Sequence, residues 1–337
     1  MTDDVGVLQH ATFDVPNRSC GYCTDDVGRA LIVACDAAAQ PGDRVAGRLV
    51  TTYLSYLHDA QLPDGWFHNF MGYDRGWQDA VGAPDAVGRA IWGLGYAEAY
   101  APRVSWKTLA GQMRRRALDA IPRMEYVRSY AYASLGLAHA LASRPDDELV
   151  VRALLDDALG KIAAAYDAVR TDGWAWCEPA LTYDNARLPE ALLRGGTLLG
   201  NPRYRDIGLA MLDFYCGAVI EDDTFVPVGS AGWYPRGGVK SRSGQQPLEA
   251  AAMVDASLVA FDLTGDERWQ RIAEIAHAWY FGNNTHHATL VAHGGCCDGI
   301  DDGGVNPNMG AESTLCYLMS ASALAKRTQP RTLRVAQ

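Results

Sequence analysis

Six segments of the sequence have the composition of helices that are apolar nearly all the way round, and this pattern constrains the fold most strongly. Each is rich in Ala, Leu and Gly, and almost no alternating strand pattern separates them. The six segments are 25–37, 85–99, 126–142, 184–199, 247–263 and 310–325. A helix without a polar face is buried inside a protein. The pattern therefore predicts six inner helices that pack on one another.

Amphipathic segments with a charged face alternate with these apolar ones. They are 43–59, 105–120, 147–168, 202–217 and 266–281. A helix with a charged stripe lies between the core and water. Six inner helices within a ring of outer ones form an all-α (α/α)6 barrel, a six-hairpin toroid with long rim loops. A sixth outer helix is not evident. We expect one barrel domain over residues 1–326 and a polar C-terminal tail over 327–337.

Charge and hydropathy exclude several classes of function. The formal charge is −10, whereas binding to nucleic acid requires clustered Lys and Arg. No apolar stretch of about 18 residues is present, so no membrane span is expected. The acidic N-terminus lacks the apolar region of a signal peptide, which favours a cytoplasmic location.

The eight cysteines are scattered along the chain, and without a secretion signal we expect free thiols. Cys20-x-x-Cys23 and Cys296-Cys297, with nearby histidines, leave a zinc site as an alternative. Those histidines are His286, His287 and His293. Vicinal cysteines serve one tetrahedral ion poorly, so we predict neither a metal nor a cofactor.

The inner helices of a toroid run in the same direction, so their N-termini meet at one rim. Their partial positive charge and free N–H groups stabilise polar ligands there. Loops 64–84, 172–184 and 221–246 precede inner helices and mix aromatic rings with carboxylates and amides, which is typical of sugar binding. We expect substrate contacts from Trp66, His68, Trp77, Asp85, Arg89, Trp174, Trp176, Tyr183, Arg187, Trp233, Gln246, Glu249 and Glu312. Alternatively, the aromatic rings only anchor the loops to the barrel.

Cleavage of a glycosidic bond requires two carboxyl groups. Glu178 lies within an aromatic loop and has no helix to cap, so we predict that it is the general acid. Asp25 and Asp26 begin an inner helix, where consecutive side chains point about 100° apart. One of them would cap the helix and the other would act as base or nucleophile, with Asp184 as a supporting carboxylate. Capping without catalysis is the alternative.

Three arginines follow the acids at the starts of inner helices by three or four residues, on the same helical face. They are Arg29, Arg89 and Arg187. We favour a structural role for them, as clamps between hairpins, over contact with substrate. His68 and His293 are either proton shuttles or hydrogen-bonded surface groups.

Motifs along most of the chain carry a family resemblance. They are GYCTDDVGRALIVA, DAVGRAIWGLG, WCEPALTYDNARLPEALL, QQPLEAAAMVDA and MGAESTL. As a set they resemble the six-hairpin glycosidase superfamily, and more closely a group of bacterial (α/α)-barrel proteins that are glycoside-hydrolase-like or glycosyltransferase-associated. That group usually has Asn where Val27 stands here. The Asp25-Asp26 pair is also similar to the catalytic acids of bacterial endo-α-1,6-mannanases.

The resemblance implies a carbohydrate-active barrel that acts on an oligosaccharide or glycan. A glycoside hydrolase, with inversion favoured, is our first hypothesis. A sugar epimerase or isomerase of the N-acylglucosamine 2-epimerase type is an alternative, but it would need histidine bases, and only His139 lies on an inner helix. A non-catalytic glycan-binding barrel that assists a glycosyltransferase partner is the third.

Overall fold

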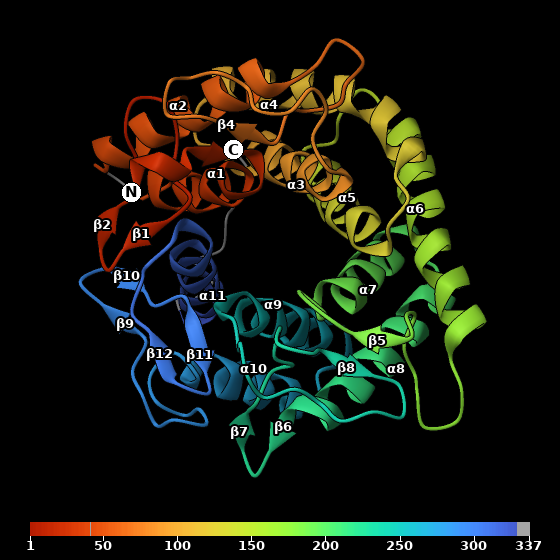
Figure 1. Cartoon of the computed structure of the whole chain (residues 1–337). Helices are drawn as coiled ribbons and strands as arrows, with labels where there is room; N and C mark the ends of the chain where they lie inside the picture. Colours follow the sequence, from red (N-terminus) through yellow and green to blue (C-terminus); the bar gives the residue numbers. More distant parts are fainter. Residues whose placement is uncertain (41, 329–337) are drawn as a thin grey trace.

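Two concentric rings of helices form the structure, a computed structural model that describes residues 1–40 and 42–328 (Figure 1). The inner ring consists of α1 (Thr24–Ala38), α3 (Pro84–Tyr100), α5 (Val127–Leu141), α7 (Arg187–Leu199), α9 (Pro247–Thr264) and α11 (Ala311–Thr328). Each inner helix packs on the next, and α11 packs on α1, so the ring closes. The prediction of an all-α (α/α)6 barrel is confirmed.

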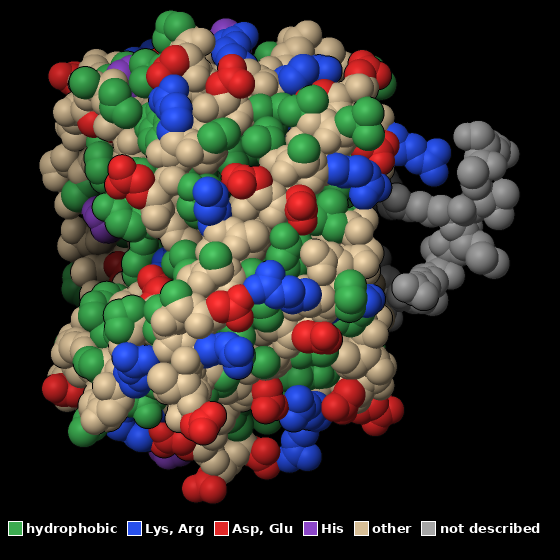
Figure 2. All heavy atoms as spheres, turned by 90° about the vertical axis from the view of Figure 1, so that its right-hand side faces the viewer, with side chains coloured by type: hydrophobic (Ala, Val, Ile, Leu, Met, Phe, Trp, Pro, Cys, Tyr) green, Lys and Arg blue, Asp and Glu red, His purple; other side chains and the backbone are tan. Residues whose placement is uncertain are grey.

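The outer ring consists of α2 (Arg44–Ala60), α4 (Val104–Ala117), α6 (Glu148–Val169), α8 (Pro202–Val219) and α10 (Glu267–Ala278). Each packs against the inner helix that precedes it. Within residues 1–40 and 42–328, no sixth outer helix follows α11. Acidic and basic side chains are interspersed on the outer surface near α6 and α8 (Figure 2), where Arg152 pairs with Glu148 and Arg203 with Asp167. This charged face is the one that the amphipathic pattern predicts.

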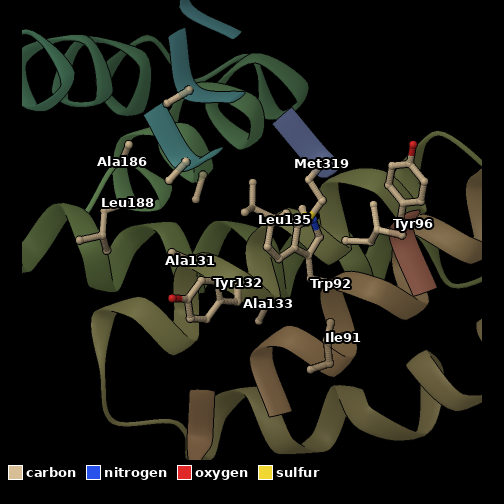
Figure 3. Packing of buried hydrophobic residues seen from close by; sticks show 14 of the residues in the cluster. Ile91, Trp92, Tyr96, Ala131, Tyr132, Ala133, Leu135, Ala186, Leu188 and Met319 are labelled. Carbon is tan, nitrogen blue, oxygen red and sulfur yellow. The ribbon is translucent and has the colours of Figure 1, made fainter. Parts of the chain in front are cut away.

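Small residues bring the inner helices close together. A Cβ atom on Gly95 of α3 would lie 2.0 Å from the carbonyl oxygen of Gly136 on α5, closer than atoms can approach. Larger buried side chains fill the space beside these contacts (Figure 3), and the rings of Trp92 and Tyr132 stack with centroids 6.3 Å apart. The glycines in the apolar segments therefore set the spacing between helices.

Short antiparallel strand pairs join the rim loops. They are β1 (Ala11–Thr12) with β2 (Val15–Pro16), β3 (Tyr22–Cys23) with β4 (Phe70–Met71), β5 (Ala180–Leu181) with β8 (Tyr234–Pro235), β6 (Ile220–Glu221) with β7 (Thr224–Phe225), β9 (Val291–Ala292) with β10 (Gly295–Cys296), and β11 (Gly299–Asp301) with β12 (Gly304–Asn306). Two 3₁₀ helices, η1 (Arg18–Cys20) and η2 (Leu118–Arg123), complete the elements. The β5–β8 pair ties loop 172–184 to loop 221–246.

The helix boundaries differ from the predicted segments by up to three residues. Helix α7 begins at Arg187 because Asp184 adopts a left-handed conformation, with φ of 48°. Arg327 and Thr328 continue α11, whereas the rest of the predicted tail, 329–337, lies outside the described residues. In the part of the chain that the structure describes, no helix has both the length and the apolar character needed to cross a membrane.

Candidate functional site

A cavity of about 350 Å³ lies at the N-terminal ends of the inner helices. Its lining residues are Asp25, Arg29, Asp85, Arg89, Tyr183, Ser230, Trp233, Gln246, Leu248 and Glu312. Six belong to the first two turns of α1, α3, α9 and α11, and the other four belong to the loops before α7 and α9. The sequence predicts the site at this rim, and seven of the residues predicted to contribute to catalysis or substrate binding line the cavity there.

Arg89 lies at the centre of the site and is 4% exposed. Its Nη2 donates a hydrogen bond of 2.7 Å to Tyr132 Oη, and the guanidinium lies 4.0 Å from the centroid of that ring. Nε is 3.4 Å from Asp25 Oδ1, and Nη1 is 3.2 Å from Asp184 Oδ2. Nη1 nevertheless makes no hydrogen bond, so one buried donor of the cavity wall is unsatisfied.

Asp25 and Asp26 have different surroundings. The Asp25 carboxyl lines the cavity, and its Oδ1 is buried without a hydrogen-bond partner. Asp26 is buried, where its Oδ1 accepts a 3.0 Å hydrogen bond from Arg29 Nη1 and its Oδ2 accepts one from Cys23 Sγ. Arg29 Nη2 donates to Glu312 Oε2 at 2.6 Å and thereby joins α1 to α11. Asp25 is therefore the acid of this pair that faces the cavity.

Burial also shifts the pKa values of these two acids. Burial raises the pKa of Asp25, against the opposing charges of Arg89 and Arg29. Burial likewise raises the pKa of Asp26 to about 6, although Arg29 opposes the shift. Both carboxyl groups thus hold a proton more tightly than an exposed aspartate does.

Asp85 accepts hydrogen bonds from two neutral donors. Ser129 Oγ donates to Oδ1, and Tyr183 Oη donates to Oδ2 at 2.6 Å. The guanidinium of Arg128 lies over the Tyr183 ring, 4.6 Å from the ring centroid, and the centroids of the Tyr183 and Trp233 rings are 6.3 Å apart.

Trp233 adopts a left-handed conformation, with φ of 59°. Such backbone strain in a non-glycine residue often marks a functional position.

Glu178, the predicted general acid, lies outside the cavity. Both of its carboxylate oxygens accept hydrogen bonds from Arg128 Nη1, at 2.7 and 2.6 Å, and it does not line the cavity. A general acid holds a proton, whereas both oxygens of Glu178 accept from the Arg128 guanidinium, and its catalytic role stays a prediction. Glu178 instead holds the Arg128 guanidinium in place, and this guanidinium lies over the Tyr183 ring. The two residues of the pair are 50 positions apart, so no spacing in the sequence could reveal it.

Several expected substrate contacts pack the fold instead. Trp66, Trp174 and Trp176 are buried, and Trp176 is fully inaccessible. Trp66 Nε1 donates to the Gly82 carbonyl, and Trp174 Nε1 donates to the Glu178 carbonyl. These three rings anchor the loops, as the alternative interpretation held. Trp77 stacks on His68 with centroids 4.8 Å apart, and neither residue lines the cavity.

A buried charged layer lies behind the cavity wall. Glu249 accepts a hydrogen bond of 2.7 Å from Tyr215 Oη and a second hydrogen bond from the backbone N–H of Asp184. Arg187 donates to Glu190 at 2.6 Å and to Asp255 of α9 at 2.7 Å. The contact with Asp255 joins α7 to α9, which is the clamp role favoured for Arg187, and none of these residues lines the cavity.

The cysteines are free thiols. Over residues 1–40 and 42–328, no group of three or more His, Cys, Asp or Glu side chains is arranged to hold a metal ion.

Comparison with known proteins rests on structure, because no protein-family model and no curated protein matches the sequence. A sugar epimerase from a ruminal bacterium superposes with a TM-score of 0.75 at 11% identity, over 98% of this chain and 94% of the other. A D-mannose isomerase superposes with a TM-score of 0.71 at 12% identity, over 96% of this chain and 92% of the other. The GH76 α-mannanase of Bacteroides thetaiotaomicron superposes with a TM-score of 0.62 at 11% identity, over 92% of this chain and 88% of the other.

The chain has the same (α/α)6 barrel fold as these proteins. At these identities the similarity establishes the barrel architecture and does not distinguish between the reactions that barrels of this kind carry out.

Proposed function

We propose that this six-hairpin barrel is a glycoside hydrolase in which Asp25 is the general acid and Asp85 the second catalytic carboxylate. The observation that carries the proposal is the convergence of three carboxyl groups on one aromatic-edged cavity, namely those of Asp25, Asp85 and Glu312. Glycoside hydrolysis uses two carboxyl groups with different protonation states.

The surroundings of the two acids support different roles. Asp25 has a raised pKa and a buried oxygen without a hydrogen-bond partner, which suits a group that keeps a proton for the leaving oxygen. Asp85 accepts hydrogen bonds from Ser129 and Tyr183, which suits a carboxylate that activates water. We favour inversion, in which that water attacks from the opposite face of the sugar. Glu312 is bound by Arg29 and serves to bind hydroxyl groups.

The other lining residues support binding of one sugar unit. Trp233 and Tyr183 supply aromatic faces, whereas Gln246 and the unsatisfied Nη1 of Arg89 supply hydrogen-bonding groups. At about 350 Å³ the cavity is near the lower end of the range for ligand pockets, about 300–1,000 Å³. This size favours a chain end over a long stretch of glycan.

Sugar epimerisation is the second candidate, and it is favoured by the higher TM-scores of the epimerase and the isomerase. That reaction requires a base to remove a proton from a carbon atom of the sugar. Within the described residues no histidine lines the cavity. His139 instead contacts Tyr96 and Tyr100 near the C-terminal ends of α3 and α5, and burial lowers its pKa well below the usual value. A carboxylate would have to act as the base, so hydrolysis is preferred.

The test compares variants on a panel of oligosaccharides. We expect Asp25→Asn and Asp85→Asn each to reduce the release of reducing ends by about 10²–10⁴-fold. Asp223→Asn, at an exposed ion pair with Arg271, is the matched control and should leave turnover unchanged. Retention of full activity by both cavity variants would refute the proposal. Binding without turnover in the wild type would favour the glycan-binding barrel that assists a glycosyltransferase.

A further inference from the structure

Carboxyl groups outnumber cations around the cavity. Two guanidinium groups, those of Arg29 and Arg89, line it. Each contacts two acids, since Arg29 binds Asp26 at 3.0 Å and Glu312 at 2.6 Å, and Arg89 lies 3.2 Å from Asp184 and 3.4 Å from Asp25. Even when Asp25 and Asp26 hold protons, the carboxylates of Asp85, Asp184 and Glu312 outnumber these two cations, and Asp85 is bound by the neutral donors Ser129 and Tyr183.

Among residues 1–40 and 42–328, no further cation lines the cavity. Arg128 is bound by Glu178, and Arg187 is bound by Glu190 and Asp255. Within the part of the chain that the structure describes, neither a lysine nor a histidine lines the cavity. The wall therefore presents a negative field to any ligand.

Two buried polar atoms of the wall make no hydrogen bond, which independently indicates a ligand. They are Nη1 of Arg89, whose side chain is 5% exposed, and Oδ1 of Asp25. A ligand that satisfies both must bring an acceptor to the guanidinium and a donor to the carboxyl group. Sugar hydroxyl groups can do either, but an ammonium group brings three donors together with a positive charge.

We infer that the cavity prefers a sugar unit with a free amino group over the same unit with a hydroxyl, an N-acetylamino or a carboxylate group. The inference rests on the proposed function, because it assumes that the cavity binds a sugar. The ammonium group lies against the lining carboxyl groups, and a neighbouring hydroxyl accepts from Arg89. A uronic acid is repelled by the same carboxylates, since like charges at close range are unfavourable.

Calorimetry with matched methyl glycosides tests the preference. The amino, hydroxyl, N-acetylamino and uronic acid forms are compared in the gluco, galacto and manno series, at mildly acidic pH, where the amine is protonated. In the series that binds, we expect the amino form to bind at least tenfold more tightly than the hydroxyl form, and the uronic acid to bind most weakly. Equal or weaker binding of the amino form would overturn the inference.

The two proposals fail in different ways. If hydroxyl sugars bind and are hydrolysed without an amino preference, only the inference is refuted. If no sugar of any class binds, the proposed function is refuted with it.

A variant tests whether charge causes the preference. Glu312→Gln removes one lining carboxylate, while Arg29 keeps its contact with Asp26. We expect the affinity ratio of amino to hydroxyl form to fall severalfold, and added salt to reduce the wild-type ratio. Glu274→Gln, on the exposed face of α10, is the matched control and should leave the ratio unchanged. An amino preference that Glu312→Gln and salt both leave intact would contradict the charge argument.

Discussion

The Asp25 and Asp26 side chains, adjacent in the chain, lie in different environments. Asp25 is 27% exposed and its Oδ1 lies 3.4 Å from Arg89 Nε on α3, whereas Asp26 is 7% exposed and is bound by Arg29 of its own helix. Consecutive residues of an α-helix project about 100° apart, so one carboxyl group reaches the cavity and the other cannot. Of the two carboxyl groups, that of Asp25 lines the cavity and that of Asp26 is held inside the barrel by Arg29.

The first prediction follows from this division. Asp25→Asn should lower turnover by about 10³-fold, because it removes the transferable proton. Asp26→Asn should change turnover by less than about tenfold, because its amide oxygen still accepts from Arg29 and does not face the ligand. Steady-state kinetics on the same oligosaccharide decide between them. A larger loss of turnover in Asp26→Asn than in Asp25→Asn would instead identify Asp26 as the catalytic acid.

Glu178→Gln tests the predicted general acid against a positioning role. The change breaks the charge pair with the buried Arg128, so the unfolding free energy should fall by about 1–3 kcal/mol. Turnover should stay within about tenfold of wild type, with the loss expressed mainly in KM through the Tyr183 ring. Urea denaturation and kinetics supply the two measurements. A thousandfold loss in kcat at unchanged stability would show that Glu178 is the acid after all.

Packing of the inner ring depends on glycine. Gly95→Ala should destabilise the protein by about 2–3 kcal/mol or more, because the new Cβ would meet the Gly136 carbonyl oxygen. Gly217→Ala on the outer helix α8 is the matched control, since open space surrounds it. It should stabilise by about 0.5–1 kcal/mol through helix propensity. Thermal or urea unfolding of both variants measures the contrast, and equal effects would contradict the close α3–α5 contact.

Glu249 should make stability depend on pH. Burial, and then the charge of Asp184, raise its pKa from 4.5 to about 7. The folded state therefore binds more protons than the unfolded state between these values, and stability falls as pH rises through this window. Relative to Glu249→Gln, the wild type should lose about 2–3 kcal/mol between pH 4.5 and pH 7. Urea denaturation of both proteins across this range gives the difference, and a constant difference would exclude the effect.

The architecture of the barrel is largely predictable from the sequence because a helix that is buried on all sides has no polar face. The segment 85–99 has no polar face, and the structure places α3 over Pro84–Tyr100. The two-residue strands were not predicted, because a pair such as Ala180–Leu181 is too short to show alternation.

The site was predictable only in part, because composition identifies the rim loops but not the direction of each side chain. Trp233 and Trp176 belong to similar aromatic loops, yet one lines the cavity and the other is fully buried. Partners distant in the chain, such as Arg128 with Glu178 and Ser129 with Asp85, leave no local signal. Glu178, held by Arg128, lies outside the cavity, whereas Asp85, held by Ser129, lines it.

Proton NMR of an oligosaccharide panel in D₂O, with and without the protein, tests the central claim most directly. Hydrolysis creates new reducing-end signals without exchange at the ring carbons, and this is the predicted result, which Asp25→Asn should abolish. Epimerisation by proton transfer would instead incorporate deuterium at carbon without new reducing ends, and it would contradict the assignment of Asp25 as the acid of a glycoside hydrolase.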